Sequence, residues 1–119
     1  MIHGSMGRAN AECIIHRVDK TTNFLERMRG LLGTRSLQPG HGLLISPCSS
    51  IHTFAMTYPI DVLFLDRHLT VVKAITSLKP WRMAACATAS LVLELAENSI
   101  DKFQLQPGQQ LEWYDEPAL

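Results

Sequence analysis

One stretch of the chain, residues 47–56, brings together residue types that could do chemistry. On an extended strand side chains alternate between two faces, so one face would carry Cys48, Ser50, His52, Phe54 and Met56. A thiolate, an imidazole and a thioether are ligands for soft metals such as copper(I) or zinc. Residues four apart on a strand are separated by about 13 Å, however, which is too far for one ion. We therefore predict no metal site here, and interpret the face as a half-buried strand.

The same face could support nucleophilic catalysis. Cys48 would attack, His52 would act as the base, and Asp61 would orient the histidine. These residue types suit a thiol-dependent or metal-assisted hydrolase, but strand geometry separates the thiol from the imidazole. Asp61 also has a structural interpretation, because an aspartate before a buried strand often accepts hydrogen bonds from backbone donors. The pattern favours a domain without catalytic residues, and the hydrolase remains the alternative.

Cationic residues indicate a second candidate site, for an anion. If the C-terminal end of a helix over residues 21–33 meets the turn at Pro80, a carboxylate or a phosphate could bind to a cluster of Arg27, Arg29, Lys79 and Arg82. Trp81 would then offer a stacking face. The helix dipole also explains arginines in this position, and Trp81 could instead cover the core. The predicted ligand-binding residues are Arg27, Arg29, His52, Met56, Asp61 and Trp81.

Glu94 is a carboxylate in an otherwise apolar strand, on the face opposite three leucines. A buried carboxylate needs a partner such as an arginine. We predict a pair between Glu94 and either Arg27 or Arg29, and a loss of stability when Glu94 is replaced by alanine.

The elements that must position these residues are mostly strands. Short β-branched or apolar runs predict them at 13–18, 43–45, 62–65, 70–75, 91–96 and 110–114. Capping residues and helical spacing predict two short helices, over 21–33 and 100–105. The fold class is therefore α+β and mostly β: a small antiparallel barrel-like or sandwich-like sheet of about six to eight strands with two short helices. We favour the barrel, because closure removes exposed edges.

Composition predicts one globular domain over residues 10–119, preceded by a tag-like or disordered segment over 1–9. The hydrophobic content is 46% and the charged content 18%, as in ordinary globular proteins. Eleven basic and eleven acidic residues cancel, which argues against a nucleic-acid partner. No stretch approaches the roughly 20 apolar residues that span a bilayer, which argues against a membrane partner. Three cysteines are an odd number, which favours the reducing cytoplasm of a prokaryote.

The chain resembles DUF192, a prokaryotic family of domains of unknown function. Matching segments run in the expected order through nearly everything after about the tenth residue: 24–33, 42–45, 51–56, 59–66, 79–82, 92–95 and 107–108. The resemblance implies a compact β-rich domain with no established activity, cofactor or substrate, so it assigns no catalytic residue. The chain departs from the family at Asn98, where a glycine is frequent, and at Gln109, where an aspartate is frequent.

We therefore expect a non-enzymatic binding or accessory domain, without a cofactor, that engages a small anionic ligand or a partner protein. The alternative is the hydrolase centred on Cys48, His52 and Asp61. A third possibility is a self-associating interaction module with Trp113 and Tyr114 at a dimer seam, so the expected state is a monomer or a weak homodimer.

Overall fold

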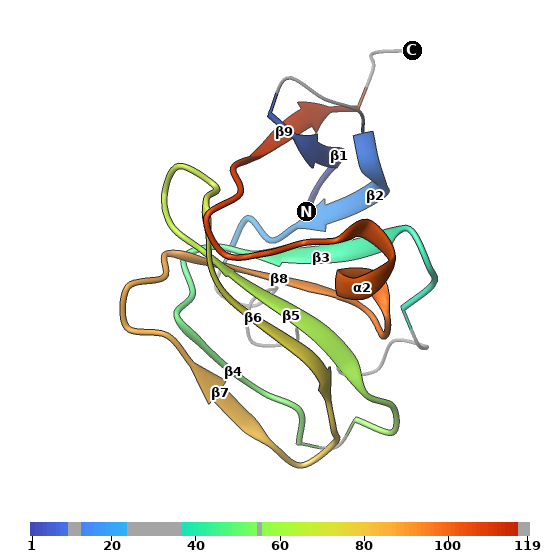
Figure 1. Cartoon of the computed structure of the whole chain (residues 1–119), viewed down its shortest axis with the longest axis vertical. Helices are drawn as coiled ribbons and strands as arrows, with labels where there is room; N and C mark the ends of the chain where they lie inside the picture. The colour runs from blue at the N-terminus through green and yellow to red at the C-terminus, as the bar shows by residue number, and fades with distance from the viewer. Residues whose placement is uncertain (10–12, 24–36, 55, 117–119) are drawn as a thin grey trace.

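The structure is a computed structural model, and it describes residues 1–9, 13–23, 37–54 and 56–116. Nine strands and one helix are found within these ranges (Figure 1). They are β1 (Ile2–Arg8), β2 (Cys13–Lys20), β3 (His41–Ile45), β4 (Ser50–His52), β5 (Ile60–Leu65), β6 (Val71–Leu78), β7 (Met83–Ala85), β8 (Leu91–Ala96), α2 (Ser99–Phe103) and β9 (Leu111–Asp115). Seven strands form one sheet in the order β6-β5-β8-β3-β2-β1-β9, and β4 pairs with β7 in a second sheet.

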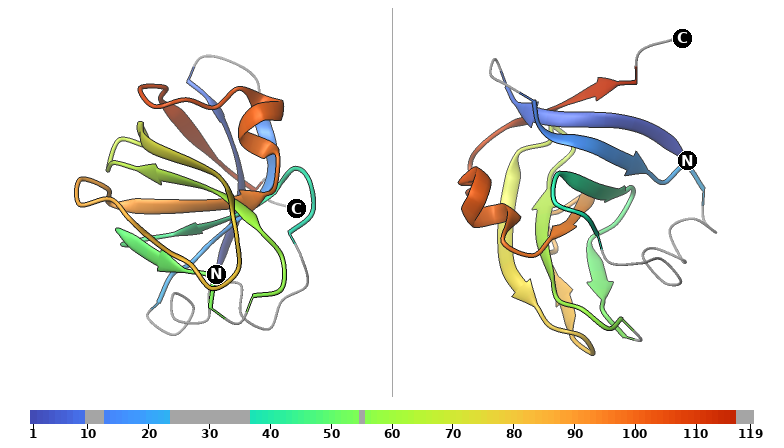
Figure 2. Two further views of the ribbon diagram at one scale, coloured as in Figure 1. Left: turned by 60° about the horizontal axis from the view of Figure 1, so that its bottom comes forward. Right: turned by 90° about the vertical axis from the view of Figure 1, so that its right-hand side faces the viewer.

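The large sheet is mixed and open, so the expected antiparallel barrel is wrong. β2 and β3 run parallel, whereas the other neighbours are antiparallel. The edge strands β6 and β9 meet at one end only, through the bridge between Thr70 and Gln110 and a hydrogen bond from the Val71 amide to the Gln109 carbonyl (2.8 Å). Beyond this point β6 pairs with β5 and β9 pairs with β1, so the two edges form no ladder. Figure 2 shows how strongly the sheet curves without closing.

β5 and β8 are buried along their whole length. Because successive side chains point to opposite faces, each strand contributes to two cores, which explains their continuous apolar sequence. The first core consists of Met6, Ile14, Ile15, Val18, Leu44, Leu63, Leu65, Val71, Leu91, Leu93, Leu95, Ile100, Leu105 and Leu111. The second core consists of Leu43, Ile45, Ile51, Met56, Ile60, Val62, Phe64, Ala89 and Val92.

The N-terminal segment, which we expected to be tag-like or disordered, contains strand β1. It pairs with β2 on one side and β9 on the other, and its Met6 side chain is fully buried. The strand was missed because it holds two glycines and no run of β-branched residues. Gly4 is required by close approach, since a Cβ there would lie 2.4 Å from the Trp113 ring.

One of the two expected helices is present as α2. It begins after Asn98, whose φ of 75° is the left-handed turn that the sequence predicts. The other expected helix, over 21–33, falls mainly on residues outside the described part of the chain. No helix in the described ranges is long and apolar enough to cross a membrane.

Asp61 is fully buried and connects three elements. Its Oδ1 accepts a hydrogen bond from the Ser77 amide on β6, and its Oδ2 accepts one from the Ile100 amide in α2, both at 2.9 Å. The carboxylate therefore fixes the end of β6 and the first turn of α2 to β5. This is the backbone-satisfying role that the position before an apolar strand suggests.

Glu94 is also buried, with 4% of its surface exposed. Its neighbours across β3 and β5 are Leu43 and Val62, and its Oε2 has no hydrogen-bond partner among the described residues. Burial raises the pKa of this carboxyl from 4.5 to about 7, because the charged form loses its hydration. The predicted pair with Arg27 or Arg29 stays a prediction, since both arginines lie outside the described residues.

Asp61→Asn should destabilise the fold by roughly 2–3 kcal/mol, because an amide offers one acceptor oxygen and leaves one buried donor unsatisfied. Asp66→Asn is the matched control. Asp66 accepts from the His68 and Thr70 amides through Oδ1 alone, so asparagine can replace it with a loss below about 1 kcal/mol. Urea unfolding measures both variants. Equal losses would contradict the bridging role of Asp61.

Glu94→Gln should remove one pH dependence of stability. Between the unfolded pKa of 4.5 and the folded pKa of about 7, the folded protein holds a proton that the unfolded chain has lost. The free energy of unfolding of the wild type therefore falls as pH rises through this window, by at most about 3 kcal/mol, whereas the glutamine side chain of the variant cannot titrate. Urea midpoints at about pH 5 and pH 8 test this. If the wild type is instead less stable at about pH 5 than at about pH 8, and Glu94→Gln removes this difference, the arginine pair is indicated.

Candidate functional site

β4 and β7 form a short two-stranded ribbon that covers the second core (Figure 1). Across it Ile51 lies opposite Ala84, and both side chains pack on the second core. The flanking pairs, Ser50 with Ala85 and His52 with Met83, are exposed. The ribbon therefore has a buried inner face and an outer face that carries side chains to solvent, as expected from strand alternation.

Aromatic side chains form a row at one end of this ribbon. The rings of His52 and Phe54 are 4.9 Å apart between centroids, and those of Phe54 and Trp81 are 5.7 Å apart and nearly parallel. Trp81 is 64% exposed and Phe54 39%, while Met83, which pairs with His52, is 72% exposed. These four residues, His52, Phe54, Trp81 and Met83, are called the aromatic surface below.

A buried threonine holds the two segments of the aromatic surface together. The Thr53 side chain is fully buried; its Oγ1 donates to the Lys79 carbonyl at 2.6 Å and accepts from the Arg82 amide at 2.9 Å. Its backbone amide donates to the Arg82 carbonyl at 2.8 Å, and its carbonyl accepts from the Trp81 amide at 3.0 Å. Thr53 thus satisfies most of the backbone of the turn between β6 and β7, and fixes Trp81 beside Phe54.

Trp81 itself has an unfavourable backbone conformation. Its φ is 63°, in the left-handed region that bulky L-residues rarely adopt. This conformation reduces the stability of the fold by on the order of 1 kcal/mol. It persists where the surrounding structure imposes it, often at functional sites. The side chain recovers little by burial, because most of it faces solvent. Trp81 is therefore not explained by packing.

The three predicted catalytic residues do not come together. Cys48 packs at the margin of the second core and its thiol donates to the Ser50 carbonyl at 3.0 Å. His52 is exposed, and its Nδ1 accepts from the Phe54 amide at 3.3 Å. Asp61 is buried and both its oxygens are bonded to backbone amides. Each group is engaged elsewhere, so the described geometry contains no thiol–imidazole–carboxylate relay.

Of the six predicted ligand-binding residues, two lie on one surface, Met56 and Asp61 are buried, and two lie outside the described residues. His52 and Trp81 are brought into one surface through Phe54. Met56 is buried in the second core, because the chain turns inward after Thr53, whose carbonyl accepts from the Met56 amide. Arg27 and Arg29 lie outside the described residues. The sequence missed Met83 and the role of Thr53, since neither forms a motif before the ribbon is folded.

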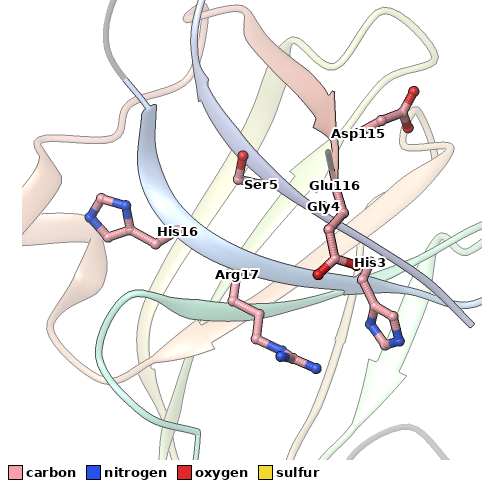
Figure 3. Close-up of a pocket in the computed structure, with 7 residues that line it drawn as sticks. All are labelled: His3, Gly4, Ser5, His16, Arg17, Asp115 and Glu116. Carbon is pink, nitrogen blue, oxygen red and sulfur yellow. The ribbon is translucent and has the colours of Figure 1, made fainter. Parts of the chain in front are cut away.

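A second feature is a polar pocket of about 260 Å³ between the first two strands and the C-terminal end of β9 (Figure 3). His3, His16, Arg17, Asp115 and Glu116 line it with Gly4 and Ser5. His3 bonds to Asp19 through Nδ1 at 2.5 Å, while His16 lies on the other side of the pocket from His3 in Figure 3. Among the described residues no group of three His, Cys, Asp or Glu side chains is placed to hold a metal ion. The charges of both signs are exposed, which does not indicate a specific ligand.

Solved structures share this fold. A crystal structure from Sinorhizobium meliloti, which carries only a provisional label of transcription regulator, superimposes with a TM-score of 0.80 at 20% identity, covering 94% of this chain and 92% of that one. A protein of unknown function from Novosphingobium aromaticivorans gives a TM-score of 0.68 at 19% identity, covering 82% and 78%. At these identities the likeness concerns the fold alone.

Sequence relatives define the family. A UPF0127 protein of Pyrococcus abyssi is 34% identical over 104 residues, covering 82% of this chain and 86% of the relative. A UPF0127 protein of Pyrococcus horikoshii is 36% identical over 99 residues, covering 77% and 83%. The family model of DUF192, described as an uncharacterized ACR, matches residues 7–113. The chain therefore belongs to the uncharacterised DUF192 family, as its motifs imply.

Proposed function

We propose that this chain is a non-enzymatic binding domain that docks a partner protein on the aromatic surface. One observation carries the proposal: Trp81 is held in a left-handed conformation by Thr53 and yet exposes most of its side chain. If the ring served the fold, it would be buried. If position 81 had no role, glycine would occupy this φ with less strain than tryptophan. Recognition of a partner explains both the strain and the exposure.

The composition of the surface supports a protein as the partner. Tryptophan, phenylalanine, methionine and arginine are enriched at the centres of protein interfaces, and tryptophan and arginine dominate binding energies there. Here Phe54, Trp81 and Met83 lie together with the exposed Arg82 beside them. Mutual stacking restricts the Phe54 and Trp81 rings, so they lose little conformational entropy on binding.

The aromatic surface lines neither the polar pocket at the N-terminal strands nor a second pocket, which is lined by Pro47, Cys48, Ser49, Ala89 and Ser90. The small anionic ligand was predicted from Arg27, Arg29, Lys79 and Arg82, and the first two of these lie outside the described residues. Trp113 and Tyr114, the expected dimer seam, hydrogen-bond to Asp115 and Glu112 on their own strand. A partner protein at the ribbon is therefore the alternative that the described geometry favours. The cytoplasm remains the proposed compartment, supported by the odd number of cysteines.

Trp81→Gly should separate binding from folding. Glycine adopts a φ of 63° without strain, so the free energy of unfolding should stay within about 1 kcal/mol of the wild type although a large side chain is lost. Thr53→Val, which removes the side-chain bonds to the same turn, should cost roughly 1–3 kcal/mol. Urea unfolding compares the two. A large loss in Trp81→Gly alone would mean that the ring serves the fold.

Selection from a phage-displayed peptide library tests docking directly. The wild type should enrich related sequences that Trp81→Gly and Met83→Ser do not retain, with affinities reduced at least about tenfold in each variant. Ile2→Ser is the matched control, because it removes an apolar side chain of 46% exposure from β1. Enriched peptides that bind the wild type and Trp81→Gly equally would place recognition elsewhere.

A further inference from the structure

The whole molecule is neutral, but its acidic residues lie outside the ribbon and the turns beside it. Residues 37–60 and 67–93 contain no aspartate or glutamate, and these two stretches supply the ribbon and the turns on either side of it. The acidic side chains near the other end of the molecule are carried by α2 and β9 and the residues beside them: Glu97, Asp101, Glu112, Asp115 and Glu116. Figure 1 shows the ribbon at the bottom and β9 at the top.

Two cations flank the aromatic surface without a carboxylate partner. Lys79 and Arg82 are exposed on either side of Trp81, and neither forms an ion pair with a described residue. The Arg82 guanidinium makes only a long contact, at 3.4 Å, with the Trp81 carbonyl. Lys73 adds a third positive charge at β7, where its Nζ donates to the Ala85 carbonyl at 3.1 Å. The positive potential of this end is thus not neutralised by the described part of the protein.

The two acidic residues that precede this turn most closely in sequence are already engaged. Asp61 bonds the Ser77 and Ile100 amides, and Asp66 bonds the amides of its own hairpin. Neither can turn toward Lys79 or Arg82 without giving up buried or turn-forming hydrogen bonds. Within the described part of the chain, no carboxylate neutralises these two cations.

We propose that the partner presents an acidic segment, in which carboxylates flank an aromatic or aliphatic anchor. This rests on the proposed function and specifies its occupant. The anchor packs against Phe54, Trp81 and Met83, and the flanking carboxylates pair with Lys79 and Arg82. Complementary charge speeds association and rejects basic partners, while the apolar contact supplies most of the affinity.

A protein segment fits this end better than a nucleic acid. The Phe54 ring stacks on Trp81 and makes a tilted contact with His52, so the three rings contact one another instead of standing apart as separate platforms for successive bases. Met83 adds an aliphatic surface of 72% exposure, which suits an apolar side chain. Phosphate-driven binding would also be expected to use more than the few cations found here.

Calorimetric titration with synthetic peptides tests the proposal. Three short peptides share a central phenylalanine, flanked by aspartate and glutamate, by lysine, or by serine and glutamine. The acidic peptide should bind at least about tenfold more tightly than the neutral one, and the lysine peptide should not bind. Raising the salt from about 0.05 M to about 0.5 M should weaken the acidic peptide by roughly tenfold.

Charge reversal supplies the matched variants. Lys79→Glu combined with Arg82→Glu should abolish the preference for the acidic peptide, whereas Lys102→Glu, on α2, should leave it unchanged. Urea unfolding confirms that the variants are folded. If acidic and neutral peptides bind equally and Trp81→Gly weakens both, the proposed docking function stands and the acidic partner is overturned.

Four other results would overturn the proposal. If no peptide binds, or if Trp81→Gly binds the acidic peptide like the wild type, the docking function fails together with it. Tighter binding of a thymidine oligonucleotide than of the acidic peptide would identify a nucleic-acid surface. A dimer in light scattering that Trp81→Gly dissociates would identify a second copy of the chain as the occupant.

Discussion

β5 and β8 bury both of their faces, and the rest of the molecule is arranged to cover them. One face of these strands builds the first core with β1, β2, α2 and β9. The other face needs a second layer, because Ile60, Val62 and Phe64 would otherwise lie in water. The ribbon of β4 and β7 supplies part of that layer. Since a two-stranded ribbon has two faces, covering the core leaves an outer face in solvent, and the aromatic surface extends from that face.

The two buried carboxyls of the sheet differ in their hydrogen bonding. Asp61 gives both oxygens to backbone amides, so its burial is compensated and it joins three elements. Glu94 lies between Leu43 and Val62, and its Oε2 has no partner among the described residues, so burial raises its pKa to about 7. The first acid stabilises the fold through these two hydrogen bonds. The second is compatible with the second core mainly in its neutral form.

The candidate site combines rigidity with exposure. Thr53 is buried and bonded on both sides of the turn, so the strained backbone of Trp81 is held by groups that do not themselves face a ligand. The rings in front of this turn stack on each other, and exposed cations lie beside them. Rigid aromatic residues within a charged border are typical of surfaces that bind other proteins. Under the proposed function, the strain in Trp81 serves recognition and is offset by the hydrogen bonds of Thr53.

The sequence by itself determined the family, the β-rich class and most strands after residue 12, because continuous apolar runs and turn residues are local patterns. It also indicated the structural role of Asp61 and the burial of Glu94, since an acid within or before an apolar strand is unusual in any fold. Only the tertiary structure decided that β1 is a strand, because its Gly4 is explained by the Trp113 ring that packs against it. The tertiary structure likewise decided that the sheet is open, because its edge strands β6 and β9 diverge. The same holds for the aromatic surface, because residues 52–54 and 81–83 become neighbours only when β4 pairs with β7. No local sequence pattern in either segment predicts this pairing.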